Sequence, residues 1–145
     1  MMKHARRWAL ALVASSSLVI PATAVLPSAS ALAATSCKQP THVWIATPAG
    51  TLANGNTLAL APDTLVYPVG VVQPGTTIYF YTPSQAALGY RTNAAGSNCV
   101  VNQPQSGNAP AIGDVPAGTY PVDATYIPWE TGNQVTTLVG YVYVP

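Results

Sequence analysis

Apolar and polar residues alternate in short runs along the chain from residue 42 onward, and Pro, Gly, Asn and Asp separate these runs. Alternation with a period of two places apolar side chains on one face of a β-strand, whereas a helix would need a stripe every 3.6 residues. The pattern predicts an all-β fold, an antiparallel β-sandwich of seven or eight strands. We expect strands at residues 42–47, 57–61, 65–72, 76–82, 87–92, 98–102, 118–127 and 135–144.

The alternation also predicts which faces of two strands are buried. In residues 76–82, Ile78 and Phe80 share one face, and Tyr79 and Tyr81 share the other. Successive side chains of a strand point to opposite faces, so Ile78 and Phe80 should face the core. In the strand at 118–127 the face predicted to be buried carries Tyr120, Val122, Ala124 and Tyr126.

Turn residues punctuate these runs. The Asn-Gly pair at 54–55 is a strong hairpin signal, and the Pro-Gly pair at 74–75 favours a type II turn with a positive φ at the glycine. Pro68 and Pro121 lack an N–H donor, so they should lie at edges, bulges or unpaired positions. The longest expected loop is 103–117.

The first 33 residues have the pattern of a secretory signal peptide. A basic start is followed by an apolar run at 8–20, which is too short to span a bilayer, and then by Ala31-Leu32-Ala33, a small-x-small cleavage site. We therefore expect a signal peptide at 1–33, a single mature domain at 34–145 and a secreted protein without a membrane span. The alternatives are an earlier cleavage site at Ala22-Thr23-Ala24 and a membrane anchor in place of a signal peptide. The Arg-Arg pair at 6–7 leaves the twin-arginine route open beside general secretion.

Charge is scarce, and removal of the signal peptide changes its sign. Only 6% of the 145 residues are charged, against roughly a quarter in soluble domains, and the formal net charge is +1. Residues 34–145 keep Lys38 and Arg91 against four carboxylates, which is a net charge of −2. This balance argues against nucleic acid as a partner and favours neutral partners such as glycans, protein surfaces or copies of the chain itself.

Cys37 and Cys99 are the two cysteines of the chain. An even pair in an exported protein most simply forms a disulfide, which would stabilise the fold by about 4 kcal/mol in the chain-entropy model. The alternative is lipidation of Cys37 after Ala34-Thr35-Ser36, which would leave Cys99 unpaired. Two cysteines are too few for a cysteine-rich zinc module.

Side chains suited to catalysis are few in the expected mature domain. His42 is its one histidine, and we expect it at the surface where the first strand begins. Asp123 and Glu130 are the one close carboxylate pair, and we expect both to be solvated. Asp63 and Asp114 fall in loops without the spacing of a calcium loop. The sequence therefore predicts no enzyme activity, no cofactor and no metal site.

Two stretches resemble the bacterial immunoglobulin-like repeat of the group 3 kind, which occurs in exported surface proteins. Gly75-Thr-Thr-Ile-Tyr-Phe-Tyr81, followed by Ala87-Leu88-Gly89, is similar to the family's G-T-V-T-F-Y segment and the L-G after it. Val115-Pro-Ala-Gly-Thr-Tyr-Pro-Val-Asp-Ala-Thr-Tyr126 is similar to its L-P-A-G-T-Y-T-V-T-A-T-Y strand. The resemblance departs at Pro121, at 127–130 and over 34–60. It implies an Ig-like sandwich that acts as a spacer, adhesive or binding module without shared catalytic residues.

If the sandwich has immunoglobulin order, the strands at 76–82, 118–127 and 135–144 lie side by side in one sheet. Their outer faces would then form an aromatic platform suited to stacking on sugars or docking a partner, provided that Leu138 and Val142 face the core. The alternative is that these tyrosines only shield the sheet. The expected binding face, with Trp129 in the adjoining loop, consists of Tyr79, Tyr81, Thr119, Asp123, Thr125, Trp129, Tyr141 and Tyr143.

Three functions fit these features. The first is a secreted, non-catalytic module that binds a protein or glycan at or near the bacterial cell envelope. The second is a structural coat or fibre protein that assembles by pairing of edge strands. The third is a small exported hydrolase inhibitor that presents the loop at 103–117.

Overall fold

The computed structural model describes residues 37–101 and 109–145. The predicted signal peptide at 1–33 and part of the predicted loop at 103–117 lie outside the described residues. Within them the fold is almost entirely β, with eight strands and one short 3-10 helix. These elements are β1 (His42–Thr47), β2 (Gly50–Leu52), β3 (Asn56–Ala59), β4 (Tyr67–Val71), β5 (Tyr79–Tyr81), η3 (Pro83–Gln85), β6 (Gly89–Arg91), β7 (Gly118–Tyr126) and β8 (Val135–Val144).

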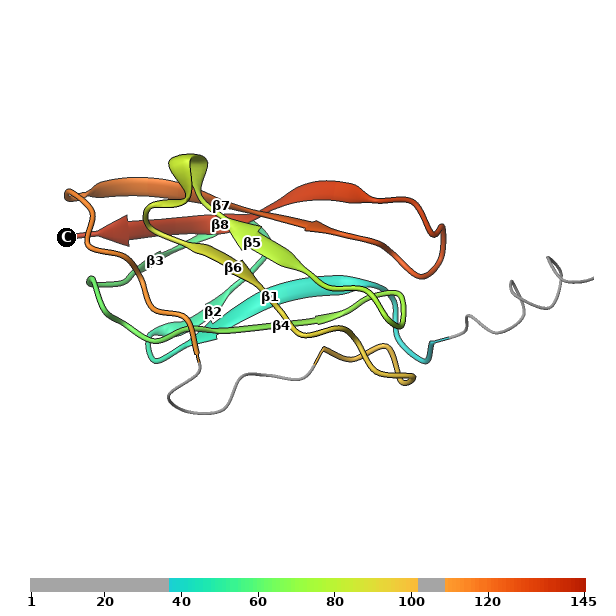
Figure 1. Cartoon of the computed structure of the whole chain (residues 1–145). Helices are drawn as coiled ribbons and strands as arrows, with labels where there is room; N and C mark the ends of the chain where they lie inside the picture. The colour runs from blue at the N-terminus through green and yellow to red at the C-terminus, as the bar shows by residue number, and fades with distance from the viewer. Residues whose placement is uncertain (1–36, 102–108) are drawn as a thin grey trace, which may run out of the picture. The chain divides into compact units, whose positions relative to one another are not determined.

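The strands form two sheets that enclose the hydrophobic core, which is the arrangement of a β-sandwich (Figure 1). One sheet has the order β2-β1-β4, and the other has the order β3-β8-β7-β5-β6. Strand β3 runs parallel to β8, and every other named strand pair is antiparallel. The strands predicted at 76–82, 118–127 and 135–144 are thus neighbours in one sheet, as β5, β7 and β8.

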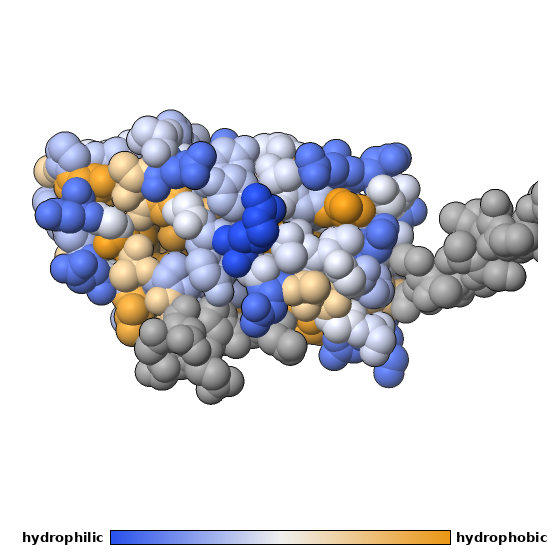
Figure 2. All heavy atoms as spheres, in the orientation of Figure 1, coloured by the Kyte–Doolittle hydropathy of each residue, from blue (hydrophilic) through white to orange (hydrophobic). Residues whose placement is uncertain are grey.

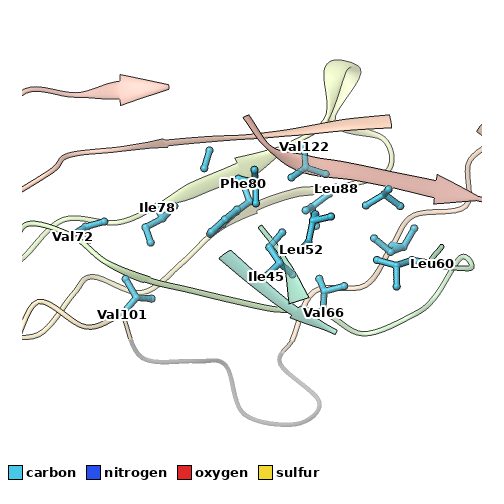
Figure 3. Close-up of a cluster of buried hydrophobic side chains, with 14 of the residues drawn as sticks. Ile45, Leu52, Leu60, Val66, Val72, Ile78, Phe80, Leu88, Val101 and Val122 are labelled. Atoms are coloured by element: carbon cyan, nitrogen blue, oxygen red, sulfur yellow. The ribbon is translucent and has the colours of Figure 1, made fainter. Parts of the chain in front are cut away.

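The predicted burial of β5 and β7 is confirmed. Ile78, Phe80, Val122 and Ala124 are buried, and Tyr120 and Tyr126 are half-buried against the same core. Full burial of a side chain as large as phenylalanine contributes about 1.5–3 kcal/mol relative to its exposure. Side chains from both sheets converge in Figure 3, which labels Ile45, Leu52, Leu60, Val66, Val72, Ile78, Phe80, Leu88, Val101 and Val122.

The prediction of a full strand at 98–102 is wrong for the described part of that range. Val100 and Val101 form only isolated bridges, to Val71 and Ala95 respectively. The physical reason is the backbone of Cys99, whose φ of 73° lies in the left-handed region and interrupts the extended conformation. The segment still lies beside β4, because the Val72 N–H donates to the Cys99 carbonyl at 2.9 Å.

The predicted turn at Asn54 and Gly55 exists, but the predicted hairpin does not. Both residues have positive φ values, 55° and 78°, yet the turn joins β2 to β3, which belong to different sheets. The Gly55 N–H donates to the Val139 carbonyl at 2.9 Å, and this bond directs the chain toward β8. The hairpin in this region is β1–β2, and the alternation had not predicted strand β2.

The predictions for Pro and for the second turn hold. Gly75 has a φ of 79°, and the Thr76 N–H donates to the Gln73 carbonyl at 3.2 Å, as in a type II turn. Pro68 lies in β4, which pairs with β1 on one side and forms only an isolated bridge, at Val71, on the other. Pro121 lies in the part of β7 beyond its pairing with β5, which ends at Asp123.

A bulge between β7 and β8 decides the condition that Leu138 and Val142 both face the core. Val122 faces Gly140 and Asp123 faces Leu138, so Val139 is an extra residue on β8. The extra residue reverses the side-chain alternation on its two sides. Val142 therefore meets the condition, at 1% exposure, whereas Leu138 points outward and is 43% exposed.

Cys37 and Cys99 form a disulfide with a Cα–Cα distance of 6.0 Å. Both cysteines of the chain are therefore paired, which overturns the alternative of a lipidated Cys37. A structural disulfide indicates an oxidising environment outside the cytoplasm.

Candidate functional site

The outer face of the five-stranded sheet carries seven of the eight residues of the expected binding face, arranged in rows by the strand register. Thr125 of β7 lies between Tyr79 of β5 and Thr136 of β8. In the next row, Asp123 lies between Tyr81 and Leu138. Two further rows pair Pro121 with Tyr141 and Thr119 with Tyr143.

Tyr79 and Tyr81 form a compact group with Arg91 of β6, here called the tyrosine–arginine cluster. The two rings stack with centroids 4.7 Å apart and planes inclined by 20°. The Arg91 Cζ lies 4.7 Å from the centroid of the Tyr79 ring, across the strand pair that joins Tyr79 to Arg91. A guanidinium near the face of an aromatic ring at an exposed site contributes about 0.5–1 kcal/mol, so Arg91 stabilises this arrangement of the rings modestly.

Hydroxyl groups continue from this cluster across β7. The Tyr81 hydroxyl lies 3.5 Å from the Thr125 Oγ1, which is 2.8 Å from the Thr136 Oγ1. Neutral hydroxyls that both donate and accept suit hydroxyl-rich or amide-rich partners.

Tyr141 and Tyr143 of β8 form a second patch, here called the β8 tyrosine pair. Tyr143 is 44% exposed, among the most exposed large hydrophobic side chains of the described residues, and Tyr141 is half-buried. Strand β3 borders this pair, with Thr57 opposite Tyr141 and Ala59 opposite Tyr143. Both of these β3 residues have small side chains and are exposed.

The two patches are separated on the sheet. Tyr81 and Tyr141 lie two strands and one row apart, which is about 12 Å at standard strand spacings. Pro121 and Asp123 occupy the positions between them. The outer face therefore presents two tyrosine patches on either side of the Asp123 carboxylate. Because Tyr79 and Tyr81 stack, each ring covers part of the other.

Trp129, the eighth residue of the expected binding face, follows β7 and is bonded to the start of the domain. Its indole N–H donates to the Gln39 carbonyl at 2.8 Å, and its backbone N–H donates to the Thr41 Oγ1 at 3.2 Å. The residue therefore attaches the start of the domain to the β7–β8 loop.

Glu130 adds two bonds to the same attachment. The Thr41 N–H donates to its Oε2 at 2.9 Å, and the Thr41 hydroxyl donates to its Oε1 at 2.6 Å. These two bonds stabilise the carboxylate and hold the pKa of Glu130 below its ordinary value. Together with the Cys37–Cys99 disulfide, they make up what we call the N-terminal anchor, which fixes residues 37–41.

Three further features were not among the predicted site residues. Arg91 was within reach of sequence analysis. Tyr90 packs against the core, so its neighbour Arg91 points to the outer face, where it lies opposite Tyr79. The His42 and Trp44 rings stack at 4.4 Å on the other sheet, with planes inclined by 10°. A cleft of about 410 Å³ borders the disulfide, and no sequence signal points to it; it is lined by Cys37, Lys38, Gln39, Val71, Ser97, Asn98 and Val100.

The ionisable groups do not converge in the described parts of the chain. No group of three His, Cys, Asp or Glu side chains lies close enough there to hold a metal ion. Asp123 lies on the outer face of β7, whereas Glu130 is bonded to Thr41. His42 is exposed, and its Nδ1 lies 3.0 Å from the Pro40 carbonyl.

Across residues 37–101 and 109–145, no helix has the length and hydropathy needed to cross a membrane. On the surface seen in Figure 2, apolar residues form small areas interrupted by polar ones. No protein-family model, curated protein or solved structure matches this chain.

Proposed function

We propose that this protein is a secreted, non-catalytic immunoglobulin-like module that binds a protein or neutral glycan at or near a bacterial cell envelope. The observation that carries the proposal is the outer face of the five-stranded sheet. It holds two tyrosine patches, a guanidinium and a row of hydroxyls on one rigid surface. Aromatic rings with polar tips supply contact area and hydrogen bonds at low entropic cost, which suits a recognition surface.

The strand order supports the immunoglobulin-like assignment. In the sheet with the order β3-β8-β7-β5-β6, β3 lies parallel to β8, the last strand of the chain, and the other neighbouring strands are antiparallel. An immunoglobulin sheet extended by one edge strand has this arrangement. Strand β1 pairs with β4 in the opposite sheet, and residues 98–101 flank β4 on its other side.

A tyrosine at the start of β7 gives independent support. The Tyr120 hydroxyl donates to the Pro116 carbonyl, four residues earlier, at 2.6 Å. A tyrosine that bonds back to the preceding loop at this strand is the tyrosine corner of immunoglobulin-like sandwiches. The resemblance of residues 115–126 to the bacterial family falls on the same segment.

The disulfide supports export. It joins two residues that are 62 positions apart in the sequence, and such a bond would persist only outside a reducing cytoplasm. The signal pattern at 1–33 agrees with that compartment.

The test is capture of partners from cell-wall polysaccharides and from extracts of bacterial surface proteins, with the purified protein immobilised. Two double variants divide the face: Tyr79→Ser with Tyr81→Ser, and Tyr141→Ser with Tyr143→Ser. We expect at least one of them to lower capture about tenfold, as for loss of aromatic anchors.

Tyr67→Ser is the matched control, because Tyr67 is a half-buried tyrosine of β4 in the other sheet. It should leave capture unchanged. Full capture by both double variants would place the binding surface elsewhere, and no capture by the unaltered protein would contradict a binding role.

A further inference from the structure

Strand β6 forms one edge of the five-stranded sheet, and its pairing with β5 can be followed beyond both of its ends. The Thr92 N–H donates to the Ile78 carbonyl at 2.9 Å. At the other end, the Thr82 N–H donates to the Leu88 carbonyl, also at 2.9 Å. Both pairs are therefore hydrogen-bonded pairs of an antiparallel ladder.

Hydrogen-bonded and non-bonded pairs alternate along such a ladder. The pair Phe80–Tyr90 lies midway between the two bonded pairs, so it is bonded as well. Gly89 and Arg91 consequently direct their N–H and C=O groups away from β5. Two donors and two acceptors of the backbone thus point out from the edge of the sheet.

The open part of this edge is short. At one end the Gly113 N–H donates to the Ala87 carbonyl at 2.9 Å, so this part of the edge is already covered. At the other end Ala95 forms a bridge with Val101. Between these two contacts, the described residues include no backbone partner for the outward groups of residues 89–93, a stretch that matches a few residues of extended chain.

The charge at this edge indicates the kind of chain that fits. Arg91 is exposed and lies in the middle of the open stretch, and Lys38 is the other basic residue of the expected mature domain. A charged side chain on a short edge strand disfavours the pairing of identical copies in the register that places Arg91 opposite its own counterpart. The same guanidinium attracts a carboxylate on a different chain.

We propose that the edge of β6 binds a short extended segment of a partner protein, which adds as an antiparallel strand and places an acidic side chain next to Arg91. The added strand would bond to Gly89 and Arg91 through the backbone, in the mode of β-strand addition. Its outward side chains would continue the rows of Tyr79 and Tyr81. This inference rests on the proposed binding function and specifies a protein as the partner.

Selection of linear heptapeptides from a random phage-displayed library on the purified protein supplies the probes. Selected peptides should contain an acidic residue, and they should slow hydrogen exchange at the amides of Gly89 and Arg91. Arg91→Pro removes one outward donor and the cation while leaving the bonds to β5 in place. We expect it to weaken the synthesised peptides at least tenfold, since a charged contact and a backbone bond are lost together.

Arg91→Glu keeps the backbone donor and tests the charge by itself if the proline variant does not fold. It should weaken acidic peptides about tenfold, whereas the control Lys38→Glu should not. Peptides that bind without protecting Gly89 and Arg91, or a selection that yields none, would overturn the proposal. A dimer in sedimentation that Arg91→Pro abolishes would assign the edge to a second copy and also overturn it. Failure of the edge proposal leaves the capture experiment with the tyrosine double variants unaffected. Failure of the proposed binding function and failure of the edge proposal can therefore be distinguished.

Discussion

The indole N–H of Trp129 donates a 2.8 Å hydrogen bond to the backbone carbonyl of Gln39, ninety residues earlier in the chain. The bond joins the loop between β7 and β8 to the segment that leads into β1. It shows that Trp129, the one tryptophan of the predicted binding face, uses its indole N–H for a bond within the domain. The tyrosines, by contrast, present hydroxyls and rings at the outer face of the sheet.

Trp129→Phe tests this attachment, because it keeps an aromatic ring and removes the donor. We expect a loss of about 0.5–1.5 kcal/mol in the free energy of unfolding, measured by urea denaturation, as for one hydrogen bond. Gln39→Ala is the control, since it leaves the accepting carbonyl in place and should change stability little. Equal losses in both variants would mean that packing, and not the indole bond, holds the segment.

The carboxylate of Glu130 makes the same attachment dependent on pH. Its pKa is lowered below the ordinary 4.5 by the hydroxyl and the backbone N–H of Thr41. The folded state therefore favours the ionised form, so the contribution to stability is present above the unfolded pKa and is lost as the pH falls through the folded pKa. The stability difference between the unaltered protein and Glu130→Gln should be largest near neutral pH and should shrink in acid.

Urea midpoints measured from neutral to strongly acidic pH give this difference directly. The two proteins differ only at residue 130, so contributions from the rest of the chain cancel in the difference. A difference that stays constant across the acidic range would show that ionisation of Glu130 plays no part in the anchor.

Gly140 at the β7–β8 bulge is a position where any side chain conflicts with backbone. A Cβ there would lie 2.7 Å from the Asn56 carbonyl oxygen and 2.7 Å from the Leu52 Cδ1. We expect Gly140→Ala to destabilise the domain by about 1–3 kcal/mol, the usual cost of overpacking, in the same denaturation measurement. Gly96→Ala, whose Cβ would meet only the Asn98 side chain, is the control, and a comparable loss there would contradict the local explanation.

Periodicity predicted the parts of this fold that depend on a uniform alternation. Ile78 and Phe80 were assigned to the core correctly because β5 has no irregularity, and the neighbouring positions of β5, β7 and β8 followed from the expected order. Leu138 does not share the core face with Val142, because a single extra residue at the bulge reverses the alternation, and nothing in the local sequence marks that residue. A bulge is a feature of the pairing between two strands, and the periodicity of one strand carries no information about that pairing.

The predicted site shows the same division between local and long-range information. The tyrosines of β5 and β8 reached the outer face because their positions depend only on strand parity. Trp129 lies in a loop, where parity says nothing, and its position depends on Gln39 and Thr41 at the other end of the domain. The stack of Tyr79 on Tyr81 depends on side-chain torsions that no sequence pattern fixes.

The Tyr120 hydroxyl offers a test of the tyrosine corner. Tyr120→Phe removes its bond to the Pro116 carbonyl while keeping the half-buried ring against the core. We expect a loss of about 1 kcal/mol in the free energy of unfolding. Tyr126→Phe is a matched control on the same face of β7, since its hydroxyl lies 3.2 Å from the Thr137 hydroxyl of the neighbouring strand and makes no bond back to the preceding loop. A larger loss for Tyr126→Phe would contradict a special role of the corner.

The disulfide should act mainly on the unfolded chain, because the N-terminal anchor has other bonds. Cys37→Ser with Cys99→Ser removes a cross-link between residues 62 apart, and the chain-entropy model gives a loss of about 4 kcal/mol. In the folded variant, the Trp129 indole and the Thr41 amide should still exchange slowly with solvent, because their acceptors remain in place. Calorimetry measures the first expectation and hydrogen exchange the second. Rapid exchange at both groups in a folded variant would show that the disulfide positions residues 37–41 itself, and that the hydrogen bonds of Trp129 and Glu130 form only because it does.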